Sequence, residues 1–359
     1  MDKVCDIIIP TWNQLETTKE CIGSLIASAS MPLQLIVVDN ASTDGTQEYL
    51  SSIKERENCA ITLILNSENK GFVRGINQGL GISKAPYVCF ANNDLIFTKG
   101  WIDEIILLFK NNSKIGVLNP NSNNLGVMPP LGIPLDRFAG DLNYRYSGIF
   151  VEMPFCIGFC MVIKRELIDK IGGLSDEFYP MFFEDTDYSM RAKKEGYLVG
   201  MSKASYVLHK EHTSISKLGL EKEEIFKRSR EIYLKKWGKD LRIAWIVNNY
   251  DELKNNLVEG LELARAGNYV WFITKVGMDR EGIFRYNRLS EHSGVQFLRS
   301  HNFFDILWKI LKKKKKYDLV ITNSKFLEII LRMLGYKVTS TVKAEQINKI
   351  KLRIKKEQI

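Results

Sequence analysis

The segment CDIIIPTWNQLETTKECIGSLIAS, residues 5–28, joins a short β-branched run to a stretch whose apolar residues recur three and four positions apart. The run CDIIIP has the length and composition of a buried strand, and turn-forming residues follow it. The stretch LETTKECIGSLIAS has the spacing of an amphipathic helix. A strand followed directly by a helix is the repeating unit of α/β proteins, so this segment predicts a sheet of mainly parallel strands.

The same alternation continues along the first two thirds of the chain. Further strand-like runs are LQLIVVD, ITLIL, YVCFAN and IGVLNP, and helical patterns lie between them. Strands that alternate with helices predict a parallel-rich sheet covered on both faces. In such sheets ligands bind beyond the carboxyl ends of the strands, where Thr11, Asp39 and Asp94 are expected to emerge.

The predicted strand ends carry polar side chains suited to a nucleotide. PTWNQ supplies the hydroxyl of Thr11 and the amide of Asn13, and VVDNASTDGT supplies Asp39, which can accept the imide N–H of a uracil or thymine ring. Asp44 in the same turn is interpreted as a turn or capping residue. NKGFVRGINQG, residues 69–79, places Arg74 within reach of a nucleobase or phosphate, although its glycines are equally explained by helix packing.

A cluster of acids predicts a second part of the same site. FFEDTDYSMRAKKEGY, residues 182–197, holds Glu184, Asp185 and Asp187 at the start of a predicted helix. Clustered carboxylates repel one another and lose hydration on burial unless a cation, a proton or a polar substrate compensates them. Together with Asp94 and the VLHKEH segment, the cluster predicts a metal-dependent site for a charged, oxygen-rich substrate. The alternative is an N-capped helix whose acids are neutralised by Arg191.

Composition limits the class of protein. The chain has 359 residues, of which 45% are hydrophobic and 26% charged, which is typical of a globular protein of two domains. No apolar run is long enough to cross a bilayer, and the N-terminus lacks the pattern of a signal peptide, so we predict a cytoplasmic protein. The six cysteines lie mostly in apolar runs, which favours reduced core thiols over disulfides or zinc ligands.

Charge divides the chain near Asp240. Residues 1–240 have a net charge of −2, whereas residues 241–359 have a net charge of +11. The shift follows a polar helical stretch and precedes a new apolar run, RIAWIVNN. We therefore predict one domain over residues 1–240 and a basic accessory domain over residues 241–359.

Residues 4 to about 215 resemble glycosyltransferase family 2, whose members are inverting, nucleotide-sugar-dependent enzymes of the GT-A type. The resemblance rests on motifs in the family's order: IIIPTWN, VVDNASTDGT, NKGFVRGIN, the triplet Asn92–Asn93–Asp94, GFCMVIKRELIDKIGGLSDEFYPMFFEDTDYSMR and VLHKEH. It implies a GT-A fold with a mixed, mainly parallel sheet in three layers. Asn92 stands where many members have an acid, a departure familiar in rhamnosyl- and galactofuranosyl-type members.

The resemblance also implies roles for individual residues. Asp94 and His209 would hold Mg²⁺ or Mn²⁺ against the donor diphosphate, with His212 as the second choice for the histidine. Asp185 would be the general base, because inverting transfer needs a proton acceptor opposite the leaving group. The predicted donor-binding residues are Thr11, Asn13, Asp39, Arg74, Asn93 and Asp94. Glu184 and Asp176 are predicted to contact the acceptor, and Asp187 to pair with Arg191.

Two regions are less regular. Asn121 to Glu152 lacks clear periodicity and is interpreted as a variable acceptor-side loop. Beyond residue 240, RIAWIVNN, YVWFITK, VQFL and YDLVITN are strand-like and alternate with helical runs, which predicts a smaller Rossmann-like unit that resembles half of a GT-B glycosyltransferase.

The basic segments of that unit predict a partner. FFDILWKILKKKKKYD and the tail KAEQINKIKLRIKKEQI combine helical apolar spacing with Lys clusters, which suits peripheral contact with an anionic membrane surface or an acidic partner. A solvated helix face explains them as well, and nucleic acid is disfavoured because no recognition motif accompanies the charge.

The leading functional hypothesis is an inverting glycosyltransferase. It would move a sugar from a UDP- or dTDP-sugar to a hydroxyl of a glycan or lipid-linked acceptor in surface polysaccharide synthesis, at the inner face of the cell membrane. Two alternatives stay open: a nucleotidyltransferase, although no triphosphate-binding loop is evident, and a catalytically silent binding subunit that retains the fold.

Overall fold

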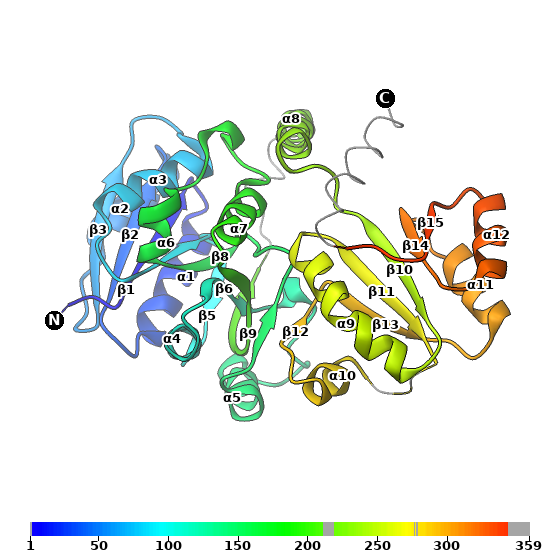
Figure 1. Cartoon of the computed structure of the whole chain (residues 1–359). Coiled ribbons are helices and arrows are strands. Elements are labelled where there is room, and N and C mark those ends of the chain that lie inside the picture. Colours follow the sequence, from blue (N-terminus) through cyan, green and yellow to red (C-terminus); the bar gives the residue numbers. More distant parts are fainter. Residues whose placement is uncertain (1, 211–218, 276, 278, 344–359) are drawn as a thin grey trace. The chain divides into compact units, whose positions relative to one another are not determined.

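The computed structural model describes residues 2–210, 219–275, 277 and 279–343. The chain divides into two compact units (Figure 1), the first comprising Met1–Phe150 and Phe155–Lys235 and the second comprising Val151–Pro154 and Lys236–Ile359. The short segment Val151–Pro154 therefore belongs with residues that follow it by almost a hundred positions. The division of roles between residues 1–240 and 241–359 stays a prediction.

The first unit is built on a mixed, mainly parallel sheet. Its strands run in the order β9-β6-β8-β4-β1-β2-β3, with β5 paired to β9. The strands β1 to β4 are parallel, and β8 is antiparallel to both β4 and β6. The bounds are β1 (Cys5–Thr11), β2 (Leu33–Asp39), β3 (Cys59–Leu65), β4 (Tyr87–Ala91), β5 (Leu95–Phe97), β6 (Ile115–Asn121), β8 (Cys160–Lys164) and β9 (Leu198–His209).

Helices cover both faces of this sheet. The helices up to residue 194 are α1 (Leu15–Ser28), α2 (Thr46–Ser52), α3 (Gly71–Ile82), α4 (Trp101–Asn111), α5 (Leu135–Tyr146), α6 (Arg165–Ile171) and α7 (Glu184–Lys194), with the short 3₁₀ turns η1 (Asn123–Leu125) and η2 (Asp176–Phe178). A later helix, α8 (Gly219–Trp237), contacts the segment before α7, where Ser229 donates to the carbonyl of Met181. The alternation of strands and helices confirms the predicted fold class.

The central strand β1 shows why its sequence is apolar throughout. Ile7 and Ile9 pack in the core formed with α1 and α4, whereas Ile8 points to the opposite face and meets Gly79 of α3. A Cβ atom on Gly79 would lie 2.4 Å from Cγ2 of Ile8, so only glycine lets α3 approach this closely. The glycine of this motif thus has a packing role, one of the two explanations that the sequence left open.

The region from Asn121 to Glu152 is more ordered than predicted. It contains α5, and its interpretation as a loop was wrong for these residues. Its apolar residues Leu135, Phe138, Ala139 and Leu142 recur three and four positions apart and lie on its less exposed side, a helical pattern that the sequence analysis overlooked. The buried Glu104 accepts hydrogen bonds from Asn143 and Ser147 at the end of α5, and the ring of Phe138 packs edge-on against a tyrosine of β9.

The six cysteines are all buried thiols, as predicted. The sulfur atoms of Cys89 and Cys160 lie 3.6 Å apart across β4 and β8. Burial raises the pKa of Cys21 and of Cys156 to about 12, so both remain protonated and unreactive at neutral pH.

The second unit contains a smaller parallel sheet, which confirms the prediction of a second α/β domain. Its strands run in the order β13-β11-β10-β14-β15 and are all parallel. β7 (Phe150–Glu152) pairs in parallel with β12 (Glu291–His292). The remaining elements are β10 (Arg242–Val247), α9 (Tyr250–Arg265), β11 (Tyr269–Thr274), α10 (Arg280–Tyr286), β13 (Val295–Arg299), α11 (Phe303–Leu311), β14 (Leu319–Ile321), α12 (Lys325–Met333) and β15 (Val338–Thr339).

The two faces of this smaller sheet carry different helices. Ile243 and Trp245 of β10 pack in one core with α9 and α10, whereas Ala244 and Ile246 pack in a second core with α11 and α12. Because alternate residues of β10 point to opposite faces of the sheet, α9 and α10 lie on one face and α11 and α12 on the other. The predicted resemblance to half of a GT-B enzyme stays a prediction.

Candidate functional site

The loops that follow β1 and β2 are bound to each other. The backbone N–H of Asn13 donates to Oγ of Ser42 at 2.7 Å, and Oδ1 of Asn13 accepts from the N–H of Thr43 at 2.8 Å. The carboxylate of Asp44 accepts from the N–H of Leu15 at the start of α1, at 3.0 Å. Asn13 therefore ties the two strand ends together, and Asp44 is the turn and capping residue that the sequence indicated.

Asp39 is buried at the end of β2 with one oxygen engaged. Its Oδ2 accepts from the N–H of Ser42 at 3.0 Å and from Nε2 of Gln47 at 2.6 Å. Its Oδ1 is also buried, and the described part of the chain offers that atom no hydrogen-bond partner. A buried carboxylate oxygen without a donor is costly, so this atom is available to a donor group on a ligand.

Thr11 and Asn93 position the end of β4. The side-chain amide of Asn93 donates to Oγ1 of Thr11 at 3.2 Å and to Oγ1 of Thr18 at 3.0 Å. Two predicted site residues therefore contact each other directly, and both contact Thr18, which the sequence analysis did not single out because it lies inside a regular helical pattern. Their contacts brace the backbone immediately before Asp94.

Asp94 and His209 lie together because β5 and β9 are adjacent. The antiparallel register pairs Leu95 with His209, and this places Nε2 of His209 3.0 Å from Oδ1 of Asp94. The contact lacks hydrogen-bond geometry, since Oδ1 of Asp94 is buried without a hydrogen-bond partner among the described residues. The two residues predicted to bind a metal thus lie close together without forming a hydrogen bond to each other.

The amide of Asn124 lies against the other ring nitrogen of His209. Nδ2 of Asn124 contacts Nδ1 of His209, while Oδ1 of Asn124 is buried and unpartnered within the described ranges. Exchanging the nitrogen and oxygen of this amide would let Oδ1 accept the Nδ1–H of the ring. The lone pair of Nε2 would then face Asp94, which is the usual arrangement of a metal-binding histidine.

The donor set fits Mg²⁺ or Mn²⁺ held jointly with a diphosphate. The described residues contain no group of three or more His, Cys, Asp or Glu that could hold a metal by itself. A carboxylate and an imidazole leave the remaining positions to phosphate oxygens and water, as is common for Mg²⁺ at phosphate sites. The second-choice ligand, His212, lies outside the described residues.

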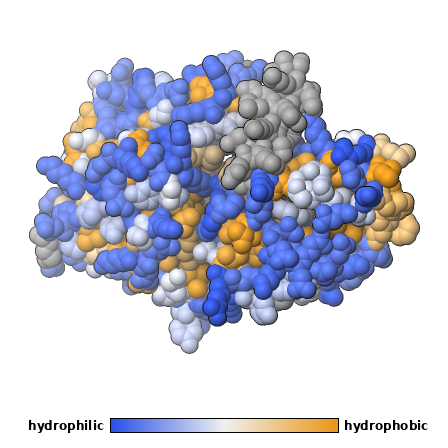
Figure 2. Space-filling model, in the orientation of Figure 1, coloured by the Kyte–Doolittle hydropathy of each residue, from blue (hydrophilic) through white to orange (hydrophobic). Residues whose placement is uncertain are grey.

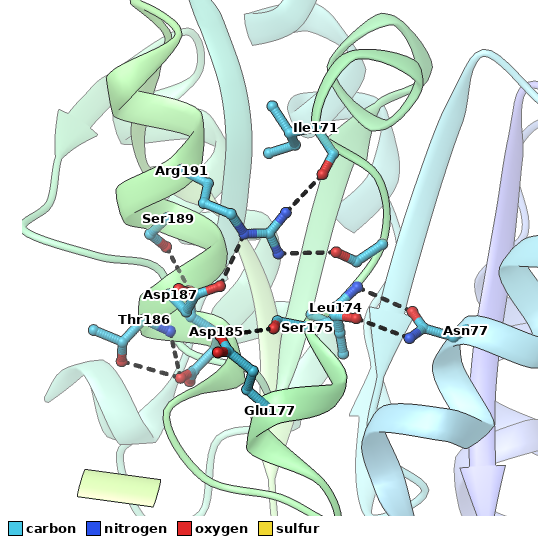
Figure 3. Close-up of polar contacts among 11 residues, drawn as sticks. Asn77, Ile171, Leu174, Ser175, Glu177, Asp185, Thr186, Asp187, Ser189 and Arg191 are labelled. Carbon is cyan, nitrogen blue, oxygen red and sulfur yellow. Dashed lines mark hydrogen bonds and ion pairs between the residues drawn. The ribbon is translucent and has the colours of Figure 1, made fainter. Parts of the chain in front are cut away.

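Glu184 and Asp185 occupy the first turn of α7, and Figure 3 shows Asp185 beside Thr186. Asp185 accepts through Oδ2 from the N–H of Gly158 at 2.7 Å, and through Oδ1 from the N–H of Thr186 at 2.6 Å. Burial still raises the pKa of Asp185. Burial, and then the neighbouring charge of Asp185, raise the pKa of Glu184 to about 8. Glu184 therefore keeps its proton at neutral pH, which removes one negative charge from the cluster.

A single dipeptide joins this carboxylate to the Asp94–His209 pair. Gly158 donates its N–H to Asp185, and the carbonyl oxygen of the next residue, Phe159, accepts from the N–H of Asn92 at 2.9 Å. The ring of Phe159 stacks on His209, with 5.5 Å between the ring centroids. The structure thus brings the predicted base and the predicted metal ligands into one site. Sequence reasoning assigned no role to Gly158 or Phe159, although both lie in the GFC motif.

The ion pair predicted between Asp187 and Arg191 is present. Oδ2 of Asp187 lies 2.8 Å from Nε of Arg191, and the two terminal guanidinium nitrogens donate to the carbonyls of Ile171 and Gly173, each at 2.8 Å (Figure 3). Arg191 thereby ties α7 to the turn after α6. The alternative of a side-chain N-cap is wrong, since the residue before α7, Phe183, has a φ of 66° and provides no capping hydrogen bond.

Arg74 and Asp176 form an exposed pair. The carboxylate of Asp176 accepts two hydrogen bonds from Arg74, at 2.8 and 2.9 Å, and the guanidinium lies 3.9 Å from the ring centroid of Tyr179. The pair lines a shallow hollow with Lys70, Asn77 and Gln78. Asp176, which was predicted to contact the sugar acceptor, thus holds in place Arg74, which was predicted to bind the nucleotide-sugar donor.

An amide network that the sequence analysis missed lies beside this hollow. Asn66 and Gln78 exchange hydrogen bonds at 2.9 Å, and Asn66 donates to Oδ1 of Asn40 at 3.0 Å. Asn40 also donates to the carbonyl of Gly71 at 3.2 Å, at the start of α3. The available signal was that Asn40 directly follows Asp39 at a strand end.

Comparison with known proteins relates most of the first unit to a family of enzymes. Residues 6–172 match the sequence model described as Glycosyl transferase family 2. The chain is 24% identical over 249 residues to the uncharacterized protein y4gI of Sinorhizobium fredii, covering 64% of this chain and 27% of that protein. It is 24% identical over 246 residues to the N-acetylglucosaminyl-diphospho-decaprenol L-rhamnosyltransferase of Mycobacterium tuberculosis, covering 60% of this chain and 78% of that protein.

Among solved structures, the chain is similar to the mannosyltransferase PcManGT of Pyrobaculum calidifontis in complex with GDP-Man and Mn²⁺. The TM-score is 0.44 with 19% identity, and the alignment covers 60% of each chain. The chain spans about a quarter of the first curated relative and a third of the second, a glycosyltransferase of Haemophilus influenzae. Over residues 6–172 the chain is therefore similar to glycosyltransferase family 2.

Proposed function

We propose that this protein is an inverting glycosyltransferase that moves a sugar from a nucleotide-diphosphate donor to a hydroxyl group of a glycan or lipid-linked acceptor. The observation that carries the proposal is the Gly158–Phe159 dipeptide, which contacts Asp185 on one side and the Asn92 and His209 region on the other. A proton acceptor and a cation site at one location are the two requirements of inverting transfer from a diphosphate.

Asp185 is the proposed general base. Its two oxygens are aligned by the N–H groups of Gly158 and Thr186, so the carboxylate has a fixed direction. The raised pKa of Asp185 makes it a better proton acceptor than an ordinary exposed aspartate. Because the neighbouring Glu184 holds a proton, the acceptor hydroxyl meets one negative charge rather than two.

Asp94 and His209 are the proposed metal ligands. Mg²⁺ or Mn²⁺ bound there would neutralise the charge that develops on the leaving diphosphate. Thr11 and Asn93 hold the end of β4, so the carboxylate of Asp94 is oriented before any ligand arrives. The protein supplies few anionic ligands at this point, since Asn92 replaces an acid.

Asp39 is proposed to recognise the nucleobase of the donor. Its unpartnered Oδ1 is suited to accept the imide N–H of a uracil or thymine ring, which supports a UDP- or dTDP-sugar as donor. Arg74, held by Asp176, is proposed to contact the nucleotide, while Glu184 is proposed to contact the acceptor. Asn13 acts on the donor by bracing the loop that carries Asp39.

The acceptor class is proposed from the relatives. The Mycobacterium tuberculosis relative is named as a rhamnosyltransferase acting on a decaprenol-linked diphosphate sugar. Together with Asn92, this supports assignment to the rhamnosyl- and galactofuranosyl-type subgroup, with a lipid-linked acceptor used in surface polysaccharide synthesis.

Thermal unfolding with nucleotide sugars tests the proposal. A ligand that binds the native protein raises the unfolding temperature, so UDP- and dTDP-sugars are expected to raise it with Mn²⁺ present and to do so less in EDTA. GDP-sugars are the matched control, because guanine presents a different pattern to Asp39. If the folded protein responds to nucleoside triphosphates and not to nucleotide sugars, a nucleotidyltransferase explains the site better. If it responds to neither class, the proposal is wrong.

A further inference from the structure

The helices α11 and α12 of the second unit are apolar on two sides. Ile306 and Ile310 of α11 and Leu327 and Leu331 of α12 point inward to the sheet and are buried. The opposite sides are also apolar, although they are exposed. The large exposed hydrophobic residues are Phe304 (78% exposed), Trp308, Leu311, Phe326, Ile329, Met333 (82% exposed) and Leu334, here called the outer face.

The outer face is continuous across the two helices. On α11 its residues are spaced four and three apart, and on α12 three and four apart, so each set forms one stripe along its helix. The ring of Phe303 lies 5.3 Å from that of Phe326, which sets the two helices side by side. Figure 2 shows hydrophobic residues gathered at the end of the second unit where Figure 1 places α11 and α12. Globular proteins rarely expose apolar residues this densely without a partner.

The surroundings of the outer face are strongly basic. Residues 303–334 contain eight Lys and Arg against three Asp and Glu. Two of those acids are paired within their own helices, Asp305 with Lys309 and Glu328 with Arg332. The run Lys312–Lys316 directly follows α11, and Nζ of Lys312 lies 4.9 Å from the ring centroid of Trp308. Cationic and exposed aromatic side chains therefore lie next to each other.

We propose that the outer face and the Lys312–Lys316 run bind the surface of an anionic lipid bilayer. Aromatic and aliphatic side chains would enter the boundary between headgroups and acyl chains, while the lysines face the phosphates. Each helix within the described ranges is too short or too polar to cross a bilayer, so the contact is peripheral. A second copy of the chain fits less well, because two faces with the same excess of positive charge repel each other.

The proposal is independent of the chemistry assigned to the first unit. It concerns residues after position 300. The residues proposed as general base, as metal ligands and for recognition of the nucleobase all lie before position 210. Its failure would leave the transfer reaction untouched. Binding to lipid is also measurable without any nucleotide sugar.

Vesicle co-sedimentation of the full chain tests the proposal. We expect binding to phosphatidylcholine vesicles that contain phosphatidylglycerol, and at least tenfold weaker binding to pure phosphatidylcholine, with the difference reduced by salt. Replacing Lys312, Lys314 and Lys315 with Gln is expected to weaken binding to the anionic vesicles on the order of 100-fold. The matched control replaces the exposed Lys54, Lys110 and Lys254 with Gln, which changes the net charge equally and should change binding little.

A second pair of variants tests the apolar contribution. Phe304→Ser with Trp308→Ser is expected to weaken binding on the order of tenfold or more, whereas Val258→Ser with Tyr286→Ser removes exposed apolar side chains elsewhere and should not. Equal binding to both kinds of vesicle, or no binding, would overturn the proposal.

Two further outcomes would assign the outer face to another occupant. If Phe304→Ser with Trp308→Ser abolishes concentration-dependent self-association in sedimentation velocity without changing vesicle binding, the face joins two copies. If the same change lowers the unfolding temperature by many degrees, the chain itself covers these side chains. Either result would exclude lipid as the occupant.

Discussion

Nε2 of His209 lies 3.0 Å from Oδ1 of Asp94, and neither atom satisfies the other through a hydrogen bond. The pairing of β5 with β9 produces this contact between residues that are far apart in the chain. The acid follows β4, at the edge where ligands bind in open sheets, and the two residues are the proposed protein ligands of a cation. The donor diphosphate is the group expected to complete its coordination.

Removing the carboxylate of this pair should disable metal-dependent binding of the donor. Asp94→Ala is expected to weaken binding of the nucleotide sugar in Mn²⁺ by at least about 10- to 100-fold, because the triplet then has no anionic ligand. Asn92→Ala is the matched control and should have a much smaller effect. Isothermal titration calorimetry in Mn²⁺ and in EDTA measures both. Equal affinity of the unmutated protein in the two buffers would contradict the metal bridge.

Neutralising the proposed base should stop transfer while leaving donor binding in place. Asp185→Asn keeps the shape of the side chain and removes its capacity to accept a proton, so turnover is expected to fall about 10²- to 10⁴-fold. Asp141→Asn, on the exposed surface of α5, is the control. Near-normal turnover of the Asp185→Asn variant on the true acceptor would exclude this role.

The raised pKa of Glu184 predicts how stability depends on pH. The folded protein binds this proton up to a pKa of about 8, whereas the unfolded chain releases it near the ordinary value of 4.5. Between these values the folded state holds more protons than the unfolded state, so this group makes the free energy of unfolding fall as pH rises, and the fall ends above about pH 8.

Glu184→Gln should remove that decline. The variant is expected to gain on the order of 1–3 kcal/mol over the unmutated protein at pH 8.5, and no more than a small difference at pH 5. Urea unfolding at the two pH values measures the difference. A stability difference that is the same at both pH values would show that Glu184 does not carry the proton.

Breaking the Asp187–Arg191 pair should destabilise the first unit. Asp187 is fully buried, so Arg191→Met removes the guanidinium that pairs with its carboxylate and is expected to cost about 3–5 kcal/mol of unfolding free energy. Arg285→Met removes an exposed arginine from a surface pair and is expected to cost about 0–1 kcal/mol. Urea unfolding compares the two. Similar small losses in both variants would mean that the buried pair is structurally dispensable.

Local patterns in the chain account for much of the fold. The apolar runs at residues 5–11 and 33–39 and the helical spacing at residues 15–28 each depend on a few neighbouring side chains, and the structure has β1, β2 and α1 at those positions. The pairing of Asp187 with Arg191 was also predictable, since residues four apart on a helix are neighbours. Strand ends bearing acids indicated which edge of the sheet to examine.

Other features required the tertiary structure because they depend on contacts between distant segments. The register of β5 on β9, rather than any local motif, brings His209 to Asp94. The apolar stripe of α5 was readable in the sequence and was overlooked, whereas the hydrogen bonds from Asn143 and Ser147 to Glu104 depend on the tertiary structure. The contact between Gly158 and Asp185 exists because the fold packs the start of α7 against the backbone of Gly158.

The protonation of the acidic cluster likewise depends partly on the sequence and partly on packing. The chain places Glu184 and Asp185 side by side, and from that alone either residue could hold a proton. Burial of Glu184 by the surrounding fold decides the matter, because desolvation penalises its charged form and raises its pKa. Sequence spacing therefore determined which residues are chemically able to act, and packing determined their protonation and partners, since a pKa and a strand register depend on surroundings that periodicity does not encode.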